Sequence, residues 1–208
     1  AAFAVLTALF YRNRTGKGQF IDLAQAESFL PHMGESIMEY SMNGDVPEAI
    51  GNGHAFMAPH GCYRCDGEDR WVVIAVSSES EWNDFCEIMG NPDWTQEDKF
   101  STRASRHQNQ EEMNEYITNW TIDKDPFELM QRLQKAGIAA SPVTKQSDLY
   151  ADPHLKERGF FEEIDHREAG QIRVPGIGFK YSKTPLTFRM PAACLGVHND
   201  YVFRELLG

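Results

Sequence analysis

Apolar residues recur every three to four positions near the start of the chain, and this spacing predicts helices there. Residues 1–14 form one such pattern and end in basic side chains, which complement the dipole at a helix C-terminus. Residues 25–42 form a second pattern, with a bend expected at Pro31 because proline removes a backbone donor. The short segment of residues 19–24 between them is rich in apolar side chains and predicts a strand.

The middle of the chain changes from a strand pattern to a helix pattern. Residues 62–65 and 71–76 flank an Asp-Gly turn, so they predict a β-hairpin. Capping signals and apolar stripes then predict three helices: one opened by a Ser78–Glu81 capping box and ended by Gly90, one around Met113–Trp120, and one opened by Asp125–Pro126 and ended by Gly137. A short strand is predicted over residues 140–143.

The last part of the chain is rich in glycine and proline. Asp152 begins a turn or helix, residues 171–175 and 179–182 predict strands, and Asn199 is expected to cap a last helix over residues 200–207. Taken together, these patterns predict an α/β chain in which a helix-rich small domain lies between two outer segments.

Composition and charge narrow the classes of function. With 41% hydrophobic and 25% charged residues, the 208-residue chain can bury a globular core, and no apolar run is long enough to span a bilayer. The net charge of −11 argues against nucleic acid as a partner, because binding phosphates needs a basic surface. The four cysteines are interpreted as reduced thiols, which predicts a cytoplasmic protein.

Several motifs resemble nucleotide sites but are incomplete. Residues 15–19 (Thr-Gly-Lys-Gly-Gln) match half of a phosphate loop, yet the upstream glycine and the Ser or Thr after the lysine are missing. Residues 51–53 and 176–178 are Gly-x-Gly pairs without the third glycine of a dinucleotide fingerprint. A helix end followed by a turn explains the first of these motifs, and turns explain the others.

Histidines and cysteines in the middle of the chain raise the question of zinc. His54, His60, Cys62 and Cys65 do not have the spacing of paired ligand knuckles. If Cys62 and Cys65 lie on one strand, their thiols point to opposite faces, because side chains alternate along a strand. No Gly-x-Ser-x-Gly nucleophile elbow is present either. We therefore predict no metal site, and the residues alone give no complete catalytic set.

Several segments, taken in order, resemble the family III CoA-transferases, which include formyl-CoA transferase, carnitine CoA-transferase and alpha-methylacyl-CoA racemase. The matching segments are Arg14–Gln19 with Ile21-Asp22, Gly51–His54, Ala58–Arg64 with Asp66-Gly67, Asp152–Leu155 with Arg158–Phe160, Thr184-Pro185, Leu195–Asn199 and Glu205–Gly208. The resemblance runs along the whole chain.

The resemblance implies a fold that periodicity does not reveal. Its members have a large Rossmann-like domain and a small α/β domain, and two chains interlock as a homodimer. On this comparison, residues 1–42 are part of the large domain and residues 43–59 are a linker. Residues 60–148 are the small domain, and residues 149–208 return through a second linker to the large domain.

The resemblance also implies a mechanism. An aspartate attacks an acyl-CoA, and covalent aspartyl intermediates pass CoA to an acceptor acid, so the partners are acyl-CoA and carboxylic acid substrates and no further cofactor is needed. That aspartate falls upstream of Ala1, and Asp22 is not its equivalent, so no catalytic residue is assigned. The chain opens on Ala1 rather than methionine, and we expect a fragment that alone is inactive and binds CoA weakly.

The loop before the hairpin holds the candidate substrate-binding residues. Asn52, His54, His60 and Gly61 lie where the resemblance places the acyl site. The formyl-CoA transferase branch has a glycine-rich loop here, whereas this chain has bulky side chains at residues 56–57, which argues for a larger or more apolar acyl group. Two alternatives stay open: a relative of alpha-methylacyl-CoA racemase, and a non-catalytic module for oligomerisation or binding.

Overall fold

The computed structural model describes residues 1–188 and 190–208. The chain divides into two compact units, residues 1–53 and residues 54–208.

The first unit consists of helices. Helix α1 (Ala2–Thr15) ends at Gly16, whose φ of 70° is left-handed, as glycine allows. Helix α2 (Gln25–Phe29) is followed by a 3-10 turn (Leu30–Met33) and by helix α3 (Gly34–Asn43). The predicted bend is confirmed, because the 3-10 turn contains Pro31.

The strand predicted over residues 19–24 is wrong. This segment is extended but joins no sheet among the described residues. A strand is defined by the hydrogen-bond ladder to a neighbour, so apolar residues alone do not make one. The first unit has no buried residue, and its helices carry many exposed apolar side chains.

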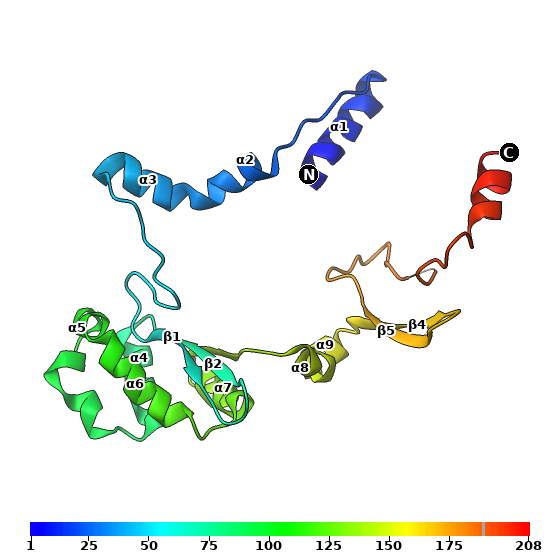
Figure 1. The fold of residues 1–208 in the computed structure, drawn as a ribbon. Coiled ribbons are helices and arrows are strands. Elements are labelled where there is room, and N and C mark those ends of the chain that lie inside the picture. The colour runs from blue at the N-terminus through cyan, green and yellow to red at the C-terminus, as the bar shows by residue number, and fades with distance from the viewer. Residues whose placement is uncertain (189) are drawn as a thin grey trace. The chain divides into compact units, whose positions relative to one another are not determined.

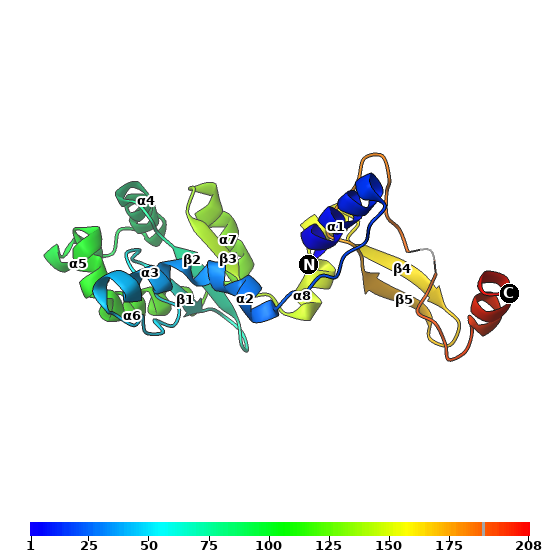
Figure 2. The same ribbon diagram turned by 90° about the horizontal axis from the view of Figure 1, so that it is seen from above.

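The second unit begins with a three-stranded antiparallel sheet, in the order β1-β2-β3 (Figures 1 and 2). Its strands are β1 (His60–Arg64), β2 (Trp71–Ala75) and β3 (Ala139–Pro142), so the predicted hairpin and third strand are confirmed. His60 and Ala139 both lie opposite Ala75. Strands β1 and β3 therefore start at the same end of the sheet, and the chain leaves β3 at the opposite end.

Four helices lie between β2 and β3: α4 (Glu79–Met89), α5 (Arg103–Gln108), α6 (Gln110–Thr121) and α7 (Pro126–Lys135). Two 3-10 turns, Asp93–Gln96 and Asp98–Phe100, connect α4 to α5. Helix α6 packs against β1, and α7 packs against β2 and β3. The side chains between helices and sheet form the core of the second unit: Tyr63, Val72, Ile74, Val76, Trp82, Phe85, Phe100, Met113, Ile117, Leu129, Leu133 and Ile138 are all buried.

The predicted caps of α4 and α7 are observed, with one change. The Ser78 side chain accepts a hydrogen bond from the Glu81 backbone N–H, as expected. The Glu81 carboxylate accepts from the backbone N–H of Ser77 at 2.6 Å, so the return bond of the box goes one residue further upstream than predicted. Asp125 accepts two backbone N–H bonds at the start of α7, and Gly90 ends α4 with a φ of 87°.

The second unit continues beyond the sheet with α8 (Gln146–Ala151), α9 (Pro153–Glu157), the antiparallel pair β4 (Phe161–His166) and β5 (Gly170–Pro175), and a π-helical turn (Tyr201–Leu206). The predicted start at Asp152 is confirmed, because its side chain caps α9. Residues 179–182 are not a strand, and β4 was missed. The last turn lies where a helix is predicted, but no side-chain cap opens it.

Candidate functional site

The loop that leads into β1 is anchored to the sheet at its downstream end. Ala58 and Pro59 are buried and joined by a cis peptide bond. The backbone N–H of Val76 donates to the Pro59 carbonyl at 2.9 Å, which extends the β1-β2 ladder beyond the strand. The loop therefore approaches the sheet as a fixed continuation of β1.

His54 folds the upstream half of the loop into a turn. Its Nδ1 accepts hydrogen bonds from the backbone N–H groups of Phe56 and Met57, both at 3.3 Å. An acceptor nitrogen carries no hydrogen, so the neutral ring carries its proton on Nε2. The Phe56 ring lies edge-on to the His54 ring, with a centroid separation of 4.4 Å. His54 therefore presents Nε2–H as its one remaining ring donor.

The structure brings three of the four predicted binding residues together. The rings of His54 and His60 lie 5.1 Å apart between centroids, and Gly61 follows His60 on β1. Both histidines are half-buried. Asn52 is exposed and belongs to the first unit, so the group described here is His54, His60 and Gly61.

Gly61 is required by its neighbour on the same face of β1. A Cβ at this position would lie 2.8 Å from both Cζ and Oη of Tyr63. The Tyr63 hydroxyl donates to Oδ1 of Asn114 on α6 at 2.7 Å, and burial raises the pKa of Tyr63. The tyrosine ring thus occupies the space of a side chain at Gly61 and ties this end of the loop to α6.

Two consecutive residues of α5 hold the loop and were not predicted. Arg106 donates from Nε to the Ala58 carbonyl at 3.2 Å, and His107 Nε2 lies 2.9 Å from the His54 carbonyl. Because a carbonyl oxygen only accepts, His107 carries a hydrogen on Nε2. Arg106 is buried, whereas Arg103 on the same helix is exposed, and the sequence alone carries no signal that distinguishes the two.

The two cysteines near the hairpin have different surroundings: Cys62 lies on β1, and Cys65 follows the last residue of that strand. Cys62 is half-buried and Cys65 is buried, and burial raises the pKa of Cys65 to about 11. Among the described residues, no three His, Cys, Asp or Glu side chains are grouped closely enough to hold a metal ion.

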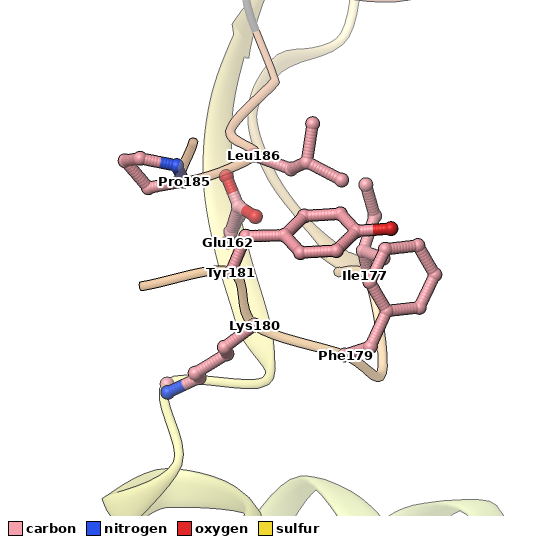
Figure 3. Close-up of a pocket in the computed structure, with 8 residues that line it drawn as sticks. Glu162, Ile177, Phe179, Lys180, Tyr181, Pro185 and Leu186 are labelled. Carbon is pink, nitrogen blue, oxygen red and sulfur yellow. The ribbon is translucent and has the colours of Figure 1, made fainter. Parts of the chain in front are cut away.

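A hollow lies in the C-terminal part of the second unit and was not predicted (Figure 3). Its volume is about 270 Å³. Figure 3 shows the Glu162 carboxylate beside the Tyr181 ring, with Phe179 and Ile177 forming an apolar wall. Lys180 turns away from that wall and donates to the Arg158 carbonyl. Glu162 accepts from the backbone N–H of Phe188 at 3.3 Å, so its carboxylate holds the surrounding chain.

The α/β fold of this chain has a counterpart among solved structures. A crystal structure of a CAIB/BAIF family protein from Brucella suis matches with a TM-score of 0.82 and 25% sequence identity, over 98% of this chain and 52% of that one. This match confirms the predicted fold class. The family model for CoA-transferase family III matches residues 1–199, and the chain belongs to that family.

Curated relatives agree with the family model. A succinyl-CoA–D-citramalate CoA-transferase from Chloroflexus aurantiacus is 29% identical over the whole of this chain and 52% of its own length. A succinyl-CoA:mesaconate CoA-transferase from Haloarcula hispanica is 30% identical over 88% of this chain and 45% of its own length. The chain thus spans about half the length of the relatives it matches.

Among the residues that the structure describes, none of the helices is long and apolar enough to cross a membrane.

Proposed function

We propose that the protein transfers coenzyme A between carboxylic acids and that the loop of residues 54–61 contacts the acyl group. The observation that carries the proposal is the match to CoA-transferase family III over residues 1–199. The named relatives are CoA-transferases that use succinyl-CoA. The chain itself offers the Nε2–H of His54 at the loop, a donor that suits the oxygen atoms of carboxylates and thioesters.

We further propose that the acyl group is carried by an aspartate outside these 208 residues. Its carboxylate oxygen attacks the thioester carbonyl and the C–S bond breaks, so CoA leaves as a thiolate and a mixed anhydride of the aspartate and the donor acid is formed. The thiolate then attacks the aspartyl carbonyl and frees the donor acid. The acceptor carboxylate next attacks the aspartyl thioester and expels CoA thiolate, which attacks the acceptor's carbonyl in the new anhydride, so that the new acyl-CoA forms and the aspartate carboxylate is released. Each step replaces one activated acyl bond by another, which is how covalent catalysis divides a difficult transfer.

The loop supports acyl groups larger than formyl. Phe56 is 58% exposed, with its ring against His54, so a bulky apolar side chain stands at the loop surface. A four- or five-carbon dicarboxylic acyl group can place its carbon chain along such a side chain and its distal carboxylate near the Nε2–H of His54. Succinyl-CoA is therefore the first donor to test.

The test uses the product of the complete reading frame beside the 208-residue chain alone. Each is mixed with succinyl-CoA and a panel of free acids, including mesaconate, malate, glutarate and oxalate, and new acyl-CoA species are identified by mass spectrometry. Hydroxylamine then cleaves any trapped aspartyl intermediate, and peptide mapping locates it. Exchange by the complete product, with a labelled aspartate outside residues 1–208, supports the proposal. Loss of the alpha-proton from branched acyl-CoAs, without transfer of CoA between acids, would instead indicate a racemase.

The proposal includes the quaternary structure and the compartment expected for such an enzyme. All four cysteines are free, which suits reduced thiols in the cytoplasm. Light scattering after size exclusion tests the homodimer: a mass of twice the complete chain supports it, and a monomer contradicts it.

A further inference from the structure

The buried guanidinium of Arg106 connects α5 to the loop that holds His54 and His60. We propose that Arg106, assisted by His107, is a positioning residue that fixes this loop and so orients His54, beside His60, toward the acyl group. The part of the proposal that concerns the acyl group rests on the proposed function. The part that concerns the loop rests on geometry alone.

Every side of the Arg106 guanidinium has a partner. The side chain is 1% exposed, and Nε donates to the Ala58 carbonyl at 3.2 Å. Nη1 donates to the Phe100 carbonyl at 3.1 Å, and Nη2 pairs with the Glu79 carboxylate at 2.9 Å. The guanidinium carbon also lies 4.6 Å from the centroid of the Trp82 ring. Because the donors form a rigid fork, these contacts fix the direction in which Nε reaches the loop.

His107 adds a second attachment four residues upstream. Its Nε2 donates to the His54 carbonyl at 2.9 Å, while Arg106 binds the carbonyl of Ala58. The residues between these carbonyls include Phe56 and Met57, whose N–H groups bind Nδ1 of His54. The turn is therefore held at both ends from α5 and closed in the middle by the His54 ring, which leaves that ring one orientation.

A stability role alone does not explain an arginine at this place. Removing a guanidinium from water is costly, and a well-packed apolar side chain in such a site is commonly as stable or more stable. Glu79, its only charged partner among the contacts described, has a side chain that is 56% exposed, so the pair is only partly shielded from water. What a methionine cannot do is bind the Ala58 carbonyl in a defined direction.

Helix α5 offers a matched control. Arg103 lies one turn earlier, is exposed, and donates to the Ser77 carbonyl at 3.2 Å rather than to the loop. Both arginines lie near Glu79, whose carboxylate also accepts the backbone N–H of Arg103. A change at Arg103 therefore disturbs the same helix and the same charge environment but leaves the loop carbonyls bound.

The experiment compares Arg106→Lys, Arg106→Met, His107→Phe and Arg103→Met in the product of the complete reading frame. The ¹⁵N shifts of His54 report its tautomer, and the exchange rates of the Phe56 and Met57 amides report the turn. We expect each Arg106 and His107 variant to mix the tautomers of His54 and to speed amide exchange at least tenfold. Arg103→Met should leave both unchanged within twofold.

Kinetics with succinyl-CoA provide the second readout. We expect kcat/KM to fall at least tenfold in Arg106→Lys while circular dichroism stays native, with Arg103→Met within twofold of the parent. Unchanged His54 shifts and amide exchange in Arg106→Lys and His107→Phe would overturn the positioning role, whatever the activity. If the parent protein has no transferase activity, the proposed function fails, and the spectra still decide whether Arg106 and His107 hold the loop. The test does not depend on whether Arg106→Met folds, because Arg106→Lys and His107→Phe each test one of the two attachments.

Discussion

Substitution of Gly61 by alanine tests the packing of the candidate site directly. The new Cβ would lie 2.8 Å from Cζ and Oη of Tyr63, whereas an ordinary contact begins at 3.4 Å, so the ring must retreat by about 0.6 Å. Tyr63 is only 2% exposed, and its hydroxyl is held by Asn114 at 2.7 Å. Overpacking of a core costs about 1–3 kcal/mol. Weakening one hydrogen bond adds up to about 1 kcal/mol.

We therefore expect Gly61→Ala to lower the free energy of unfolding by about 2–3 kcal/mol. With a urea slope of about 2 kcal/mol per M, the midpoint of unfolding falls by about 1 M. The assay is urea unfolding followed by tryptophan fluorescence, which reports the core through buried Trp82. Gly178→Ala is the matched control, because a Cβ there meets no atom within 4 Å.

A second variant distinguishes the clash from a general effect of alanine on β1. In a Tyr63→Leu background the ring is absent, so adding Gly61→Ala should lower the free energy of unfolding by less than about 0.5 kcal/mol relative to Tyr63→Leu alone. If Gly61→Ala costs nothing in the wild-type background, or the same in both, the ring does not set the requirement for glycine and the reasoning is refuted.

Three further predictions concern the second unit. Thr121→Val should lower the free energy of unfolding, measured in urea, by about 1–3 kcal/mol, because the buried hydroxyl donates to the Arg64 carbonyl at 2.7 Å. Thr121→Ser keeps the hydroxyl and should retain most of this stability, and equal losses in the two variants would contradict the prediction. The backbone N–H of Lys145 and the Arg70 side chain hold the pKa of Asp148 below its ordinary 3.8, so the carboxylate stabilises the fold above pH 3.8 and this contribution is lost as the pH falls below that value. The melting temperatures of Asp148→Asn and of the parent should therefore converge in acid. Burial raises the pKa of Cys86 to about 11, so iodoacetamide at pH 8 should label it only after unfolding, and labelling of the native protein at the unfolded rate would contradict its burial.

Local signals in the sequence predicted the central sheet and its helices well, because their caps and turns lie within a few residues of each other. The Ser78 cap and the Asp-Gly hairpin are examples. The outer segments were harder, because strand pairing depends on a partner elsewhere in the chain. Strand β4 has the sequence Phe-Glu-Glu-Ile-Asp-His, whose acidic residues disfavour a strand, yet Glu163 pairs with Arg173 across the hairpin at 3.3 Å.

The candidate site shows the same limit more sharply. The family resemblance pointed to Asn52, His54, His60 and Gly61, and the structure brings His54 and His60 together. The attachments to Arg106 and His107 join residues about fifty positions apart. Such contacts are set by how α5 packs on the sheet, and a single sequence carries no periodicity that reports them.

The odd number of strands in the central sheet has a mechanical consequence. Because β1, β2 and β3 alternate in direction, the chain enters at the His60 end and leaves beyond Pro142 at the opposite end, a distance of about 10–15 Å along the strands. Tension applied through the two flanking segments would therefore load the ladders in shear, with many hydrogen bonds resisting at once rather than opening one by one. The sheet would therefore transmit force between the two flanking segments with little extension. The helices between β2 and β3 would carry little of that force.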